Sequence, residues 1–247
     1  GRPKGFYVMP NHRNPTGESI SVRRREELVA WSRRHGVPLV EDDYDAELLL
    51  DDQPPPVALR SLDRDVTHIG TFSKRLIPAL RVGFVVAPPP LRARLERLKR
   101  DQDLGTSTLL QHALAEFLER GYLEAHLRKS LREYRARRAA LEAALSEALP
   151  PSITWRRSGR GLFLWLELPE GVASEAVYEA ARQRGVLVSP SALNRVGQTS
   201  REGLRVTFCR ESPRRLEAGA RRLAAALESV ATARRPTSAA GPRLGPI

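Results

Sequence analysis

The stretch Thr71-Phe-Ser-Lys-Arg-Leu-Ile-Pro-Ala-Leu-Arg81-Val-Gly83 is the most informative part of this chain. An apolar run typical of a strand, Val66 to Phe72, delivers Lys74 beside hydroxyl side chains, and Arg81 follows seven residues later. The chain has only four lysines among its 41 lysine and arginine residues. A lysine kept at this position indicates that an amine is required, because a primary amine forms a Schiff base and a guanidinium does not.

Size and composition indicate a globular protein of one or two domains. The chain has 247 residues, of which 41% are hydrophobic and 28% charged, which is ordinary for globular proteins. No run approaches the roughly 18 apolar residues of a membrane span. The beginning, Gly1-Arg-Pro-Lys, is neither an initiator methionine nor a signal peptide, so we expect the chain to be a piece of a longer protein located in the cytoplasm.

Cysteine and histidine content argues against disulfides and metals. Cys209 is the only cysteine, which rules out a disulfide framework within the chain. The five histidines are scattered along the sequence without metal-ligand spacing, so we predict no metal site.

The net charge of +12 invites a nucleic-acid interpretation. However, the basic clusters Arg23–Arg25 and Arg135–Arg138 lie in predicted helices next to glutamates such as Glu26 and Glu142, and no basic patch is interleaved with aromatics. We therefore predict that these clusters lie on solvated helix faces rather than on a nucleic-acid surface.

Strand and helix patterns alternate in the first part of the chain, which predicts an α/β layer with a mostly parallel sheet. The predicted strands are Gly5–Met9, Val37–Val40, Val66–Phe72 and Val82–Ala87. A helix is predicted over Ser21–His35, closed by Gly36.

From Leu91 onward the pattern becomes helical, and a smaller α/β unit follows. Helices are predicted over Leu91–Asp103, Thr108–Glu119 and Tyr122–Leu149, and the last of them would run about 40 Å and connect two domains. In the second unit the predicted strands are Ile153–Trp155, Leu162–Leu168, Val186–Ser189 and Leu204–Phe208, and the predicted helices are Ser174–Arg184 and Pro213–Ala231. Ser174 is the predicted N-cap of its helix, with Gly185 just past the end. We place the large domain at residues 1–136, the small domain at 137–231 and a disordered tail at 232–247.

Three polar clusters follow predicted strands of the first unit: Asn11–Gly17, Asp42–Asp45 and Thr71–Arg81. In an open parallel sheet, ligands bind outside the carboxyl ends of the strands. Each cluster alone is typical of a turn or a solvated loop. Their occurrence at equivalent positions predicts one ligand site.

Taken together, these motifs resemble the fold type I superfamily of pyridoxal-phosphate (PLP) enzymes, the class I and II aminotransferases. The resemblance extends through Gly161-Leu-Phe-Leu and Gly203-Leu-Arg-Val-Thr-Phe and covers the chain to about Ala231. The order of the motifs is closest to the aminotransferase-like domain of MocR-type regulators, GntR-family proteins that join a winged helix to this fold. The fold implied is a PLP-dependent transferase fold of type I, with part of the large domain and a smaller C-terminal α/β domain.

The resemblance implies that PLP is the cofactor and that Lys74 is the catalytic residue. Lys74 would hold PLP as a Schiff base and then move a proton as a general base. Asp42 would pair with the ring nitrogen and keep it protonated. Asn14 and Tyr44 would donate hydrogen bonds to the phenolic oxygen of the ring.

Four further residues complete the site that the resemblance implies. Thr71, Ser73 and Arg81 would bind the phosphate, with the Arg81 guanidinium as a charge-assisted partner. Arg205 would bind the α-carboxylate of the substrate.

Two functions fit these residues equally well. One is a PLP-dependent aminotransferase that transfers an amino group between an amino acid and a 2-oxo acid. The other is a PLP-binding sensor domain that controls an upstream winged helix, which would be the only route to DNA. An asparagine at position 14 is enzyme-like, because many MocR-type proteins look as if they carry an aromatic there. A third interpretation is a truncated, non-catalytic remnant.

The part of the superfamily that normally precedes Gly1 contains a glycine-rich turn that cradles the phosphate and an aromatic that stacks on the ring. Neither is in this chain, so we expect it to bind PLP weakly by itself. By fold analogy we also expect a homodimer, because active sites of this superfamily lie at subunit interfaces.

Overall fold

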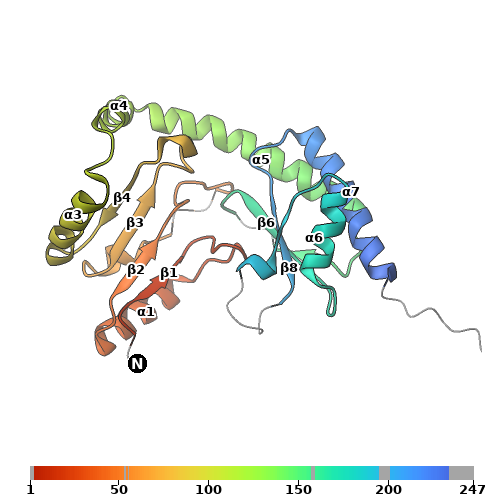
Figure 1. Cartoon of the computed structure of the whole chain (residues 1–247), viewed down its shortest axis with the longest axis horizontal. Coiled ribbons are helices and arrows are strands. Elements are labelled where there is room, and N and C mark those ends of the chain that lie inside the picture. The colour runs from red at the N-terminus through yellow and green to blue at the C-terminus, as the bar shows by residue number, and fades with distance from the viewer. Residues whose placement is uncertain (1–2, 53, 55, 157–158, 195–200, 234–247) are drawn as a thin grey trace, which may run out of the picture.

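The fold consists of two sheets that a long helix connects. The computed structural model describes residues 3–52, 54, 56–156, 159–194 and 201–233. Within these residues one sheet contains β1–β4 and the other β5–β8, and helix α5 runs along both of them (Figure 1). The strands are β1 (Phe6–Val8), β2 (Leu39–Asp42), β3 (Thr67–Thr71), β4 (Gly83–Val86), β5 (Thr154–Trp155), β6 (Phe163–Glu167), β7 (Ser189–Pro190) and β8 (Gly203–Thr207). The helices are α1 (Val22–His35), α2 (Leu59–Leu62), α3 (Pro89–Asp103), α4 (Thr108–Glu119), α5 (Tyr122–Ala148), α6 (Ser174–Gln183) and α7 (Pro213–Ala233), with the 3-10 helices η1 (Pro78–Leu80) and η2 (Ser191–Asn194).

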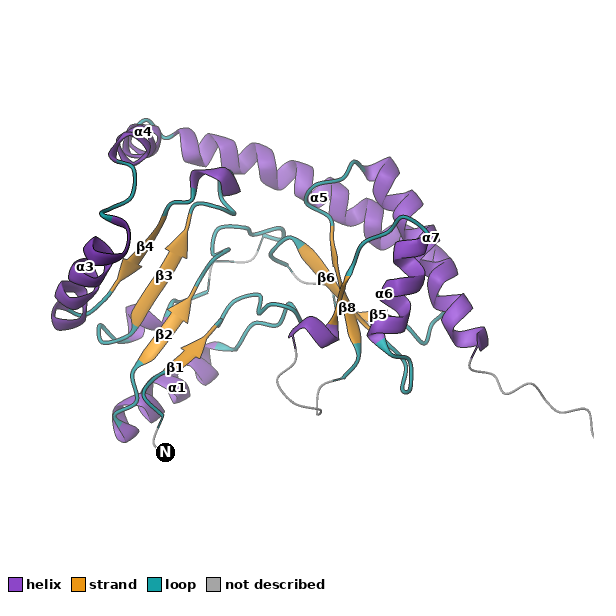
Figure 2. Cartoon of the chain, viewed as in Figure 1, coloured by secondary structure: helices purple, strands orange, loops and turns teal. Residues whose placement is uncertain are grey.

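The first sheet is mostly parallel, which confirms the predicted fold class. Strands β1, β2 and β3 run parallel, with Phe6 opposite Leu39 and Val40 opposite Thr67, whereas β4 is antiparallel to β3. Parallel neighbours need crossover connections, and α1 and the segment containing α2 provide them. The carboxyl ends of β1–β3 therefore lie at one edge of the sheet, the edge nearer the second sheet (Figure 2).

A small apolar core fixes α1 and α2 against this sheet. Val29 of α1, Leu39 of β2 and Leu59 of α2 are buried together with Val66. Helix α1 begins and ends close to the predicted residues: the Ser21 hydroxyl accepts a hydrogen bond from the Arg24 N–H, and Gly36 ends the helix in a left-handed conformation.

The second sheet is antiparallel in the order β5-β6-β8-β7. It packs with α5, α6 and α7 around the largest apolar core in the part of the chain that the structure describes. Leu145 of α5, Leu166 of β6 and Leu204 of β8 are fully buried in this core. The same core includes Leu50, which lies in the connection after β2 and thereby ties the two sheets together.

Helix α5 is the physical link between the two sheets. Its 27 residues span about 40 Å at 1.5 Å per residue. Arg135 donates a hydrogen bond of 2.6 Å to the Leu50 carbonyl. Arg138 is only 4% exposed and donates to Asp51 at 2.6 Å. The predicted solvated face is therefore wrong for Arg138, because this arginine pairs with a carboxylate from the β2–α2 connection. The proposed domain boundary at residues 136 and 137 falls inside α5.

Two predicted helix ends need correction. Ser174 is not the N-cap of α6, because Ala173 occupies that position and the Ser174 N–H donates to the Glu202 carboxylate at 3.0 Å. A carboxylate at a helix N-terminus satisfies the same exposed N–H groups as a capping hydroxyl. Helix α7 continues through Ala233, two residues past its predicted end at Ala231, and the rest of the predicted tail lies outside the described residues.

No helix among the described residues combines the length and the apolar character needed to cross a membrane.

Candidate active site

The three polar clusters predicted from the sequence meet at one edge of the first sheet. Asn11–Gly17 follows β1, Asp42 is the last residue of β2, and Thr71 is the last residue of β3. Because these strands are parallel, their ends place the clusters side by side, facing β6 and β8 of the second sheet.

Asn14 and Arg205 contact each other across the two sheets. The Arg205 Nη1 donates a hydrogen bond of 2.5 Å to the Asn14 Oδ1, although the residues are 191 positions apart. The guanidinium carbon of Arg205 also lies 5.4 Å from the centroid of the Phe163 ring, a favourable cation–π distance. A residue predicted to bind cofactor and one predicted to bind substrate therefore share one location.

Asp42 receives a hydrogen bond from a residue that no sequence motif singled out. The Tyr7 hydroxyl, on the neighbouring strand β1, donates to the Asp42 carboxylate. Burial, together with this bond, raises the pKa of Tyr7 to about 12, so Tyr7 is a neutral donor near pH 7. Only the pairing of β1 with β2 reveals which carboxylate Tyr7 faces, and the sequence pattern carries no signal for it.

Tyr44 is held by the loop that contains Asn14. Its hydroxyl donates a hydrogen bond of 2.7 Å to the carbonyl oxygen of His12. Burial is the largest cause that raises the pKa of Tyr44, and the charges of Asp45 and Asp42 add to it. Tyr44 therefore stays a neutral hydroxyl, able to donate, over the whole physiological range.

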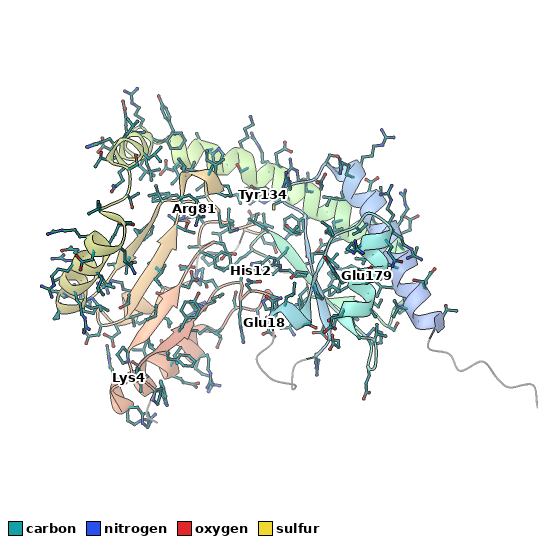
Figure 3. All side chains as sticks on the ribbon, viewed as in Figure 1. Lys4, His12, Glu18, Arg81, Tyr134 and Glu179 are labelled. Carbon is teal, nitrogen blue, oxygen red and sulfur yellow. The ribbon has the colours of Figure 1, made fainter. Side chains whose placement is uncertain are left out.

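The end of β3 presents hydroxyls and two cations. The Ser73 N–H donates to the Thr71 Oγ1 at 3.1 Å, which shapes the turn that carries Lys74. Arg81 ends η1 in a left-handed conformation, with φ 51°. The side chains of Lys74 and Arg81 are exposed and make no hydrogen bond or ion pair with the residues that the structure describes. Figure 3 shows Arg81 beside the ends of β3 and β4.

This set of donors and acceptors fits PLP. An amine and a guanidinium that form no ion pair with the described residues, next to the Thr71 and Ser73 hydroxyls, suit a phosphate and an aldehyde carbon. The Asp42 carboxylate suits a protonated ring nitrogen, and the Tyr44 hydroxyl suits a phenolate oxygen. The roles of the individual residues remain predictions.

Two cavities border Asn14. One, of about 720 Å³, lies between β1 and α1 and is lined in part by Tyr7, Ile20 and Trp31. The other, of about 490 Å³, lies between the Asn14 loop and the second sheet and is lined in part by Trp165 and by charged side chains of both signs.

Arg25 forms the floor beneath the Asn11–Gly17 loop. It is 1% exposed, and its guanidinium donates to the Asn11 Oδ1 at 2.7 Å and to the carbonyls of Pro10, Ile20 and Val57. Asn11 in turn donates to Asp43 at 2.8 Å. Burial lowers the pKa of Arg25, and the nearby carboxylates oppose this effect. The predicted solvated face holds for Arg23 and Arg24, which are exposed, but is wrong for Arg25.

The buried Glu41 and the partly buried His68 form a pair behind the strand ends. The His68 Nδ1 lies 3.0 Å from the Glu41 Oε2, and both Glu41 oxygens also accept backbone N–H groups, from Leu59 and Arg60. With Asp43, these side chains bring three possible metal ligands within 4.8 Å of one another. The hydrogen bonds of Glu41 account for the cluster without an ion.

We expect this pair to stabilise the fold most between about pH 4.5 and pH 6.5. The hydrogen bond to Glu41 raises the pKa of His68 above its ordinary 6.5, so that contribution is complete below pH 6.5 and is lost as pH rises through the raised value. Burial alone would raise the pKa of Glu41, but hydrogen bonds from His68, Leu59 and Arg60 outweigh it and lower the pKa below 4.5. The Glu41 contribution is therefore lost as pH falls through the lowered value.

His68→Gln should cost about 1.5 kcal/mol in this window and less on either side, measured by urea unfolding at several pH values. His112→Gln, at an exposed position on α4, is the matched control. A cost of His68→Gln that does not vary with pH would contradict the ion pair.

His12 is a buried site residue that sequence reasoning missed. Its Nδ1 lies 2.9 Å from the Asp45 Oδ2, and the two side chains are 0% and 2% exposed. The ring packs against Phe163, with centroids 4.2 Å apart. Gly161 makes room for it, because a Cβ at this glycine would lie 1.9 Å from the His12 Cε1. The signal available in the sequence was the position of His12 inside the Asn11–Gly17 motif.

Gly161→Ala should therefore destabilise the protein by roughly 2–4 kcal/mol, from overpacking and from a left-handed backbone that disfavours a side chain. Chemical unfolding measures this cost. The control is Gly219→Ala in α7, where a Cβ meets nothing within 4 Å, and alanine there should be neutral or slightly stabilising. Equal stabilities of the two variants would show that His12 is not confined as described.

Comparison with known proteins gives one family and two kinds of relative. The family model described as aminotransferase class I and II matches residues 2–223. The 2-aminoadipate transaminase of Thermus thermophilus is 32% identical over 93% of this chain and 58% of its own length. An uncharacterized HTH-type transcriptional regulator of Bacillus subtilis, YdfD, is 34% identical over 74% of this chain and 38% of its own length.

A solved structure agrees with the fold. The α-aminoadipate aminotransferase LysN of Thermus thermophilus, in complex with N-(5'-phosphopyridoxyl)-L-leucine, superposes with a TM-score of 0.86 at 31% identity. The match covers 94% of this chain and 60% of LysN. The chain thus spans about half the length of its relatives, which include aminotransferases and HTH-type regulators at similar identity.

Proposed function

The chain belongs to the class I and II aminotransferase family, and on that basis we propose that it is the larger part of a PLP-dependent aminotransferase. The observation that carries the proposal is the exposed Lys74 amine, which has no partner among the described side chains, at the same sheet edge as Asp42 and the Asn14–Arg205 contact. The substrates would be an amino acid and a 2-oxo acid.

Each residue of the site has a role in this proposal. When bound, PLP supplies the electron sink that stabilises negative charge at the α-carbon of an amino acid. The Lys74 amine would hold the cofactor and, once released by the incoming amino acid, would take the proton from the α-carbon and deliver it to the C4′ carbon of the cofactor. The Asp42 carboxylate keeps the ring nitrogen protonated.

The remaining residues bind and orient. Thr71, Ser73 and Arg81 hold the phosphate, the last of these by a charge-assisted contact. The Arg205 guanidinium orients the substrate carboxylate, and its present bond to the Asn14 Oδ1 shows that it reaches this edge of the sheet. The Tyr44 hydroxyl, kept neutral by burial, would turn its single hydrogen from the His12 carbonyl to the phenolic oxygen when the cofactor binds.

A half-reaction tests the proposal. Protein loaded with PLP is mixed with single amino acids, and the 2-oxo acid and the amine form of the cofactor are measured by mass spectrometry. We expect at least one amino acid to give both products in amounts equal to the protein. If no amino acid gives either product although PLP is bound, the aminotransferase proposal fails.

The second candidate is the sensor domain of an HTH-type regulator, favoured by the 34% identity to the Bacillus subtilis protein. In that case an amino acid would change the absorbance of bound PLP without release of a 2-oxo acid. Contact with DNA would require a segment outside this chain.

We also propose that the working form is a homodimer. Apolar side chains stand exposed on and between α3, α4 and α5, among them Leu98, Leu104, Leu109 and Tyr122, and burial against a second copy would remove them from water. Sedimentation equilibrium measures the assembly, and a monomer at all concentrations would contradict it.

A further inference from the structure

His12 stands where the two sheets meet. Figure 3 shows it between the carboxyl edge of the first sheet and strand β6 of the second. Its side chain is completely buried, and its ring packs on Phe163 of β6. If this position only needed to be filled, an apolar ring would suffice, because it has no polar atom that requires a hydrogen bond when buried. The buried imidazole therefore indicates a further role.

The contact with Asp45 fixes the orientation of the imidazole. Asp45 is a carboxylate acceptor 2.9 Å from Nδ1, so Nδ1 carries the hydrogen of that bond. The Nε2 atom is buried and has no hydrogen-bond partner among the described residues. A neutral ring with the hydrogen on Nδ1 leaves only a lone pair in that position, which costs less than an unpaired N–H. Asp45 therefore selects one tautomer and one ring position.

The backbone of His12 holds Tyr44, the residue assigned to the cofactor. Its N–H donates to the Ser19 Oγ at 2.9 Å, and its carbonyl oxygen receives the Tyr44 hydroxyl at 2.7 Å. The residue has φ 35°, a conformation that non-glycine residues rarely adopt. The bond between its side chain and Asp45, one residue after Tyr44, helps to hold this backbone in place.

The ring of His12 supports Arg205, the residue assigned to the substrate carboxylate, through Phe163. It supports Phe163, whose centroid lies 4.2 Å away, and the Arg205 guanidinium carbon lies 5.4 Å from the Phe163 centroid. Arg205 is the residue that donates to Asn14. The position of Arg205 relative to the Asn14 loop thus depends on a stack of rings that begins at His12.

We propose that His12 is a positioning residue that sets two groups of the site at once: its Nδ1–H, held by Asp45, places the carbonyl that receives Tyr44, and its ring places Arg205 through Phe163. This inference rests on the proposed function, which assigns Tyr44 to the cofactor and Arg205 to the substrate carboxylate. The two halves are separable, because one needs a donor nitrogen and the other needs a flat ring.

Two substitutions separate the halves. His12→Asn keeps an N–H donor near the position of Nδ1 and removes the ring, whereas His12→Phe keeps the ring and removes the donor. His112→Asn, at an exposed position on α4, is the matched control. Both readouts are taken without PLP. The first is the ionisation of Tyr44, followed by tyrosinate absorbance with Tyr44→Phe as the reference. The second is the dissociation constant of propionate, an unreactive carboxylate, measured by calorimetry.

We expect a crossed pattern. His12→Phe should release Tyr44 toward water and lower the pH at which it ionises by about one unit or more, because burial is the largest cause of the raised pKa of Tyr44. The charges of Asp45 and Asp42 would still raise this pKa, and that of Arg205 would still lower it. The dissociation constant of propionate for His12→Phe should stay within about twofold of the parent value. His12→Asn should leave the Tyr44 titration in place and weaken propionate binding about tenfold.

Other outcomes overturn the proposal. If both readouts change together in both variants, in proportion to lost stability, His12 only fills space. If neither readout changes, His12 positions neither group. If the parent protein does not bind propionate, the claim that the His12 ring places Arg205 for carboxylate binding is contradicted. Failure of the aminotransferase proposal is seen separately, as a lack of Lys74-dependent PLP uptake, and does not affect either readout.

Discussion

Lys74→Arg is expected to slow amino transfer by about 10⁴-fold or more in a single turnover, the largest effect of any substitution in this chain. Arginine keeps the positive charge at the end of β3, so the local electrostatics survive. A guanidinium, however, neither forms the covalent bond with the cofactor aldehyde nor gives up a proton near neutral pH. Rapid mixing of PLP-loaded protein with its best amino acid, followed by absorbance, measures the rate.

The matched control is Lys99→Arg. Lys99 is an exposed residue of α3 that pairs with Asp103 at 2.7 Å, and arginine can replace it in that surface pair. The rate of the control should stay within about twofold of the parent, since surface pairs contribute little. A Lys74→Arg variant that retains a tenth or more of the parent rate would show that the amine is not the reacting group.

Arg25→Met is expected to cost about 3–5 kcal/mol in the free energy of unfolding. Methionine fills much of the volume, but it leaves the Asn11 side chain and three backbone carbonyls without their donor. It also removes a positive charge that interacts with the buried Glu41 and Asp43. Urea unfolding followed by circular dichroism measures the loss.

Arg24→Met provides the comparison for this prediction. Arg24 is the preceding residue of α1, and its side chain is 72% exposed and pairs with surface Glu27. Its replacement should therefore change stability by no more than about 0.5 kcal/mol. Similar losses in the free energy of unfolding for the two variants would mean that Arg25 does not support the Asn11–Gly17 loop.

The sequence pattern predicted most helices and strands, because these elements depend on residues that are close together in the sequence. Alternation of strands and helices predicted the parallel β1–β3 sheet, and Ser21 and Gly36 marked the ends of α1. The strand ends also indicated where the polar clusters meet. Helix α2 escaped notice because it has only four residues and its N-cap makes no side-chain hydrogen bond.

Burial of charge could not be predicted in the same way. Arg23, Arg24 and Arg25 are chemically identical, and only the arrangement of Asn11 and the backbone carbonyls around α1 decides which one is buried. The same holds for Arg138, whose partner Asp51 lies 87 positions away. Local patterns carry no information about such partners.

The residues of the candidate site were identified in two ways. Family resemblance supplied Lys74, Asp42 and Arg205, while Tyr7, His12 and Arg25 emerged only from the folded arrangement. Contacts such as the one between Arg205 and Asn14 join distant segments, and no local pattern specifies them. The functional roles of these residues stay predictions until they are measured.

The central claim is tested most directly by PLP uptake. The purified protein and its Lys74→Ala variant are each incubated with PLP, their visible absorbance is recorded, and borohydride is added before peptide mass analysis. We predict an absorbance band in the parent only, with the reduced cofactor found on the peptide that contains Lys74. A band of equal strength in both proteins, or the label on another lysine, would contradict the assignment of Lys74 and with it the proposed function.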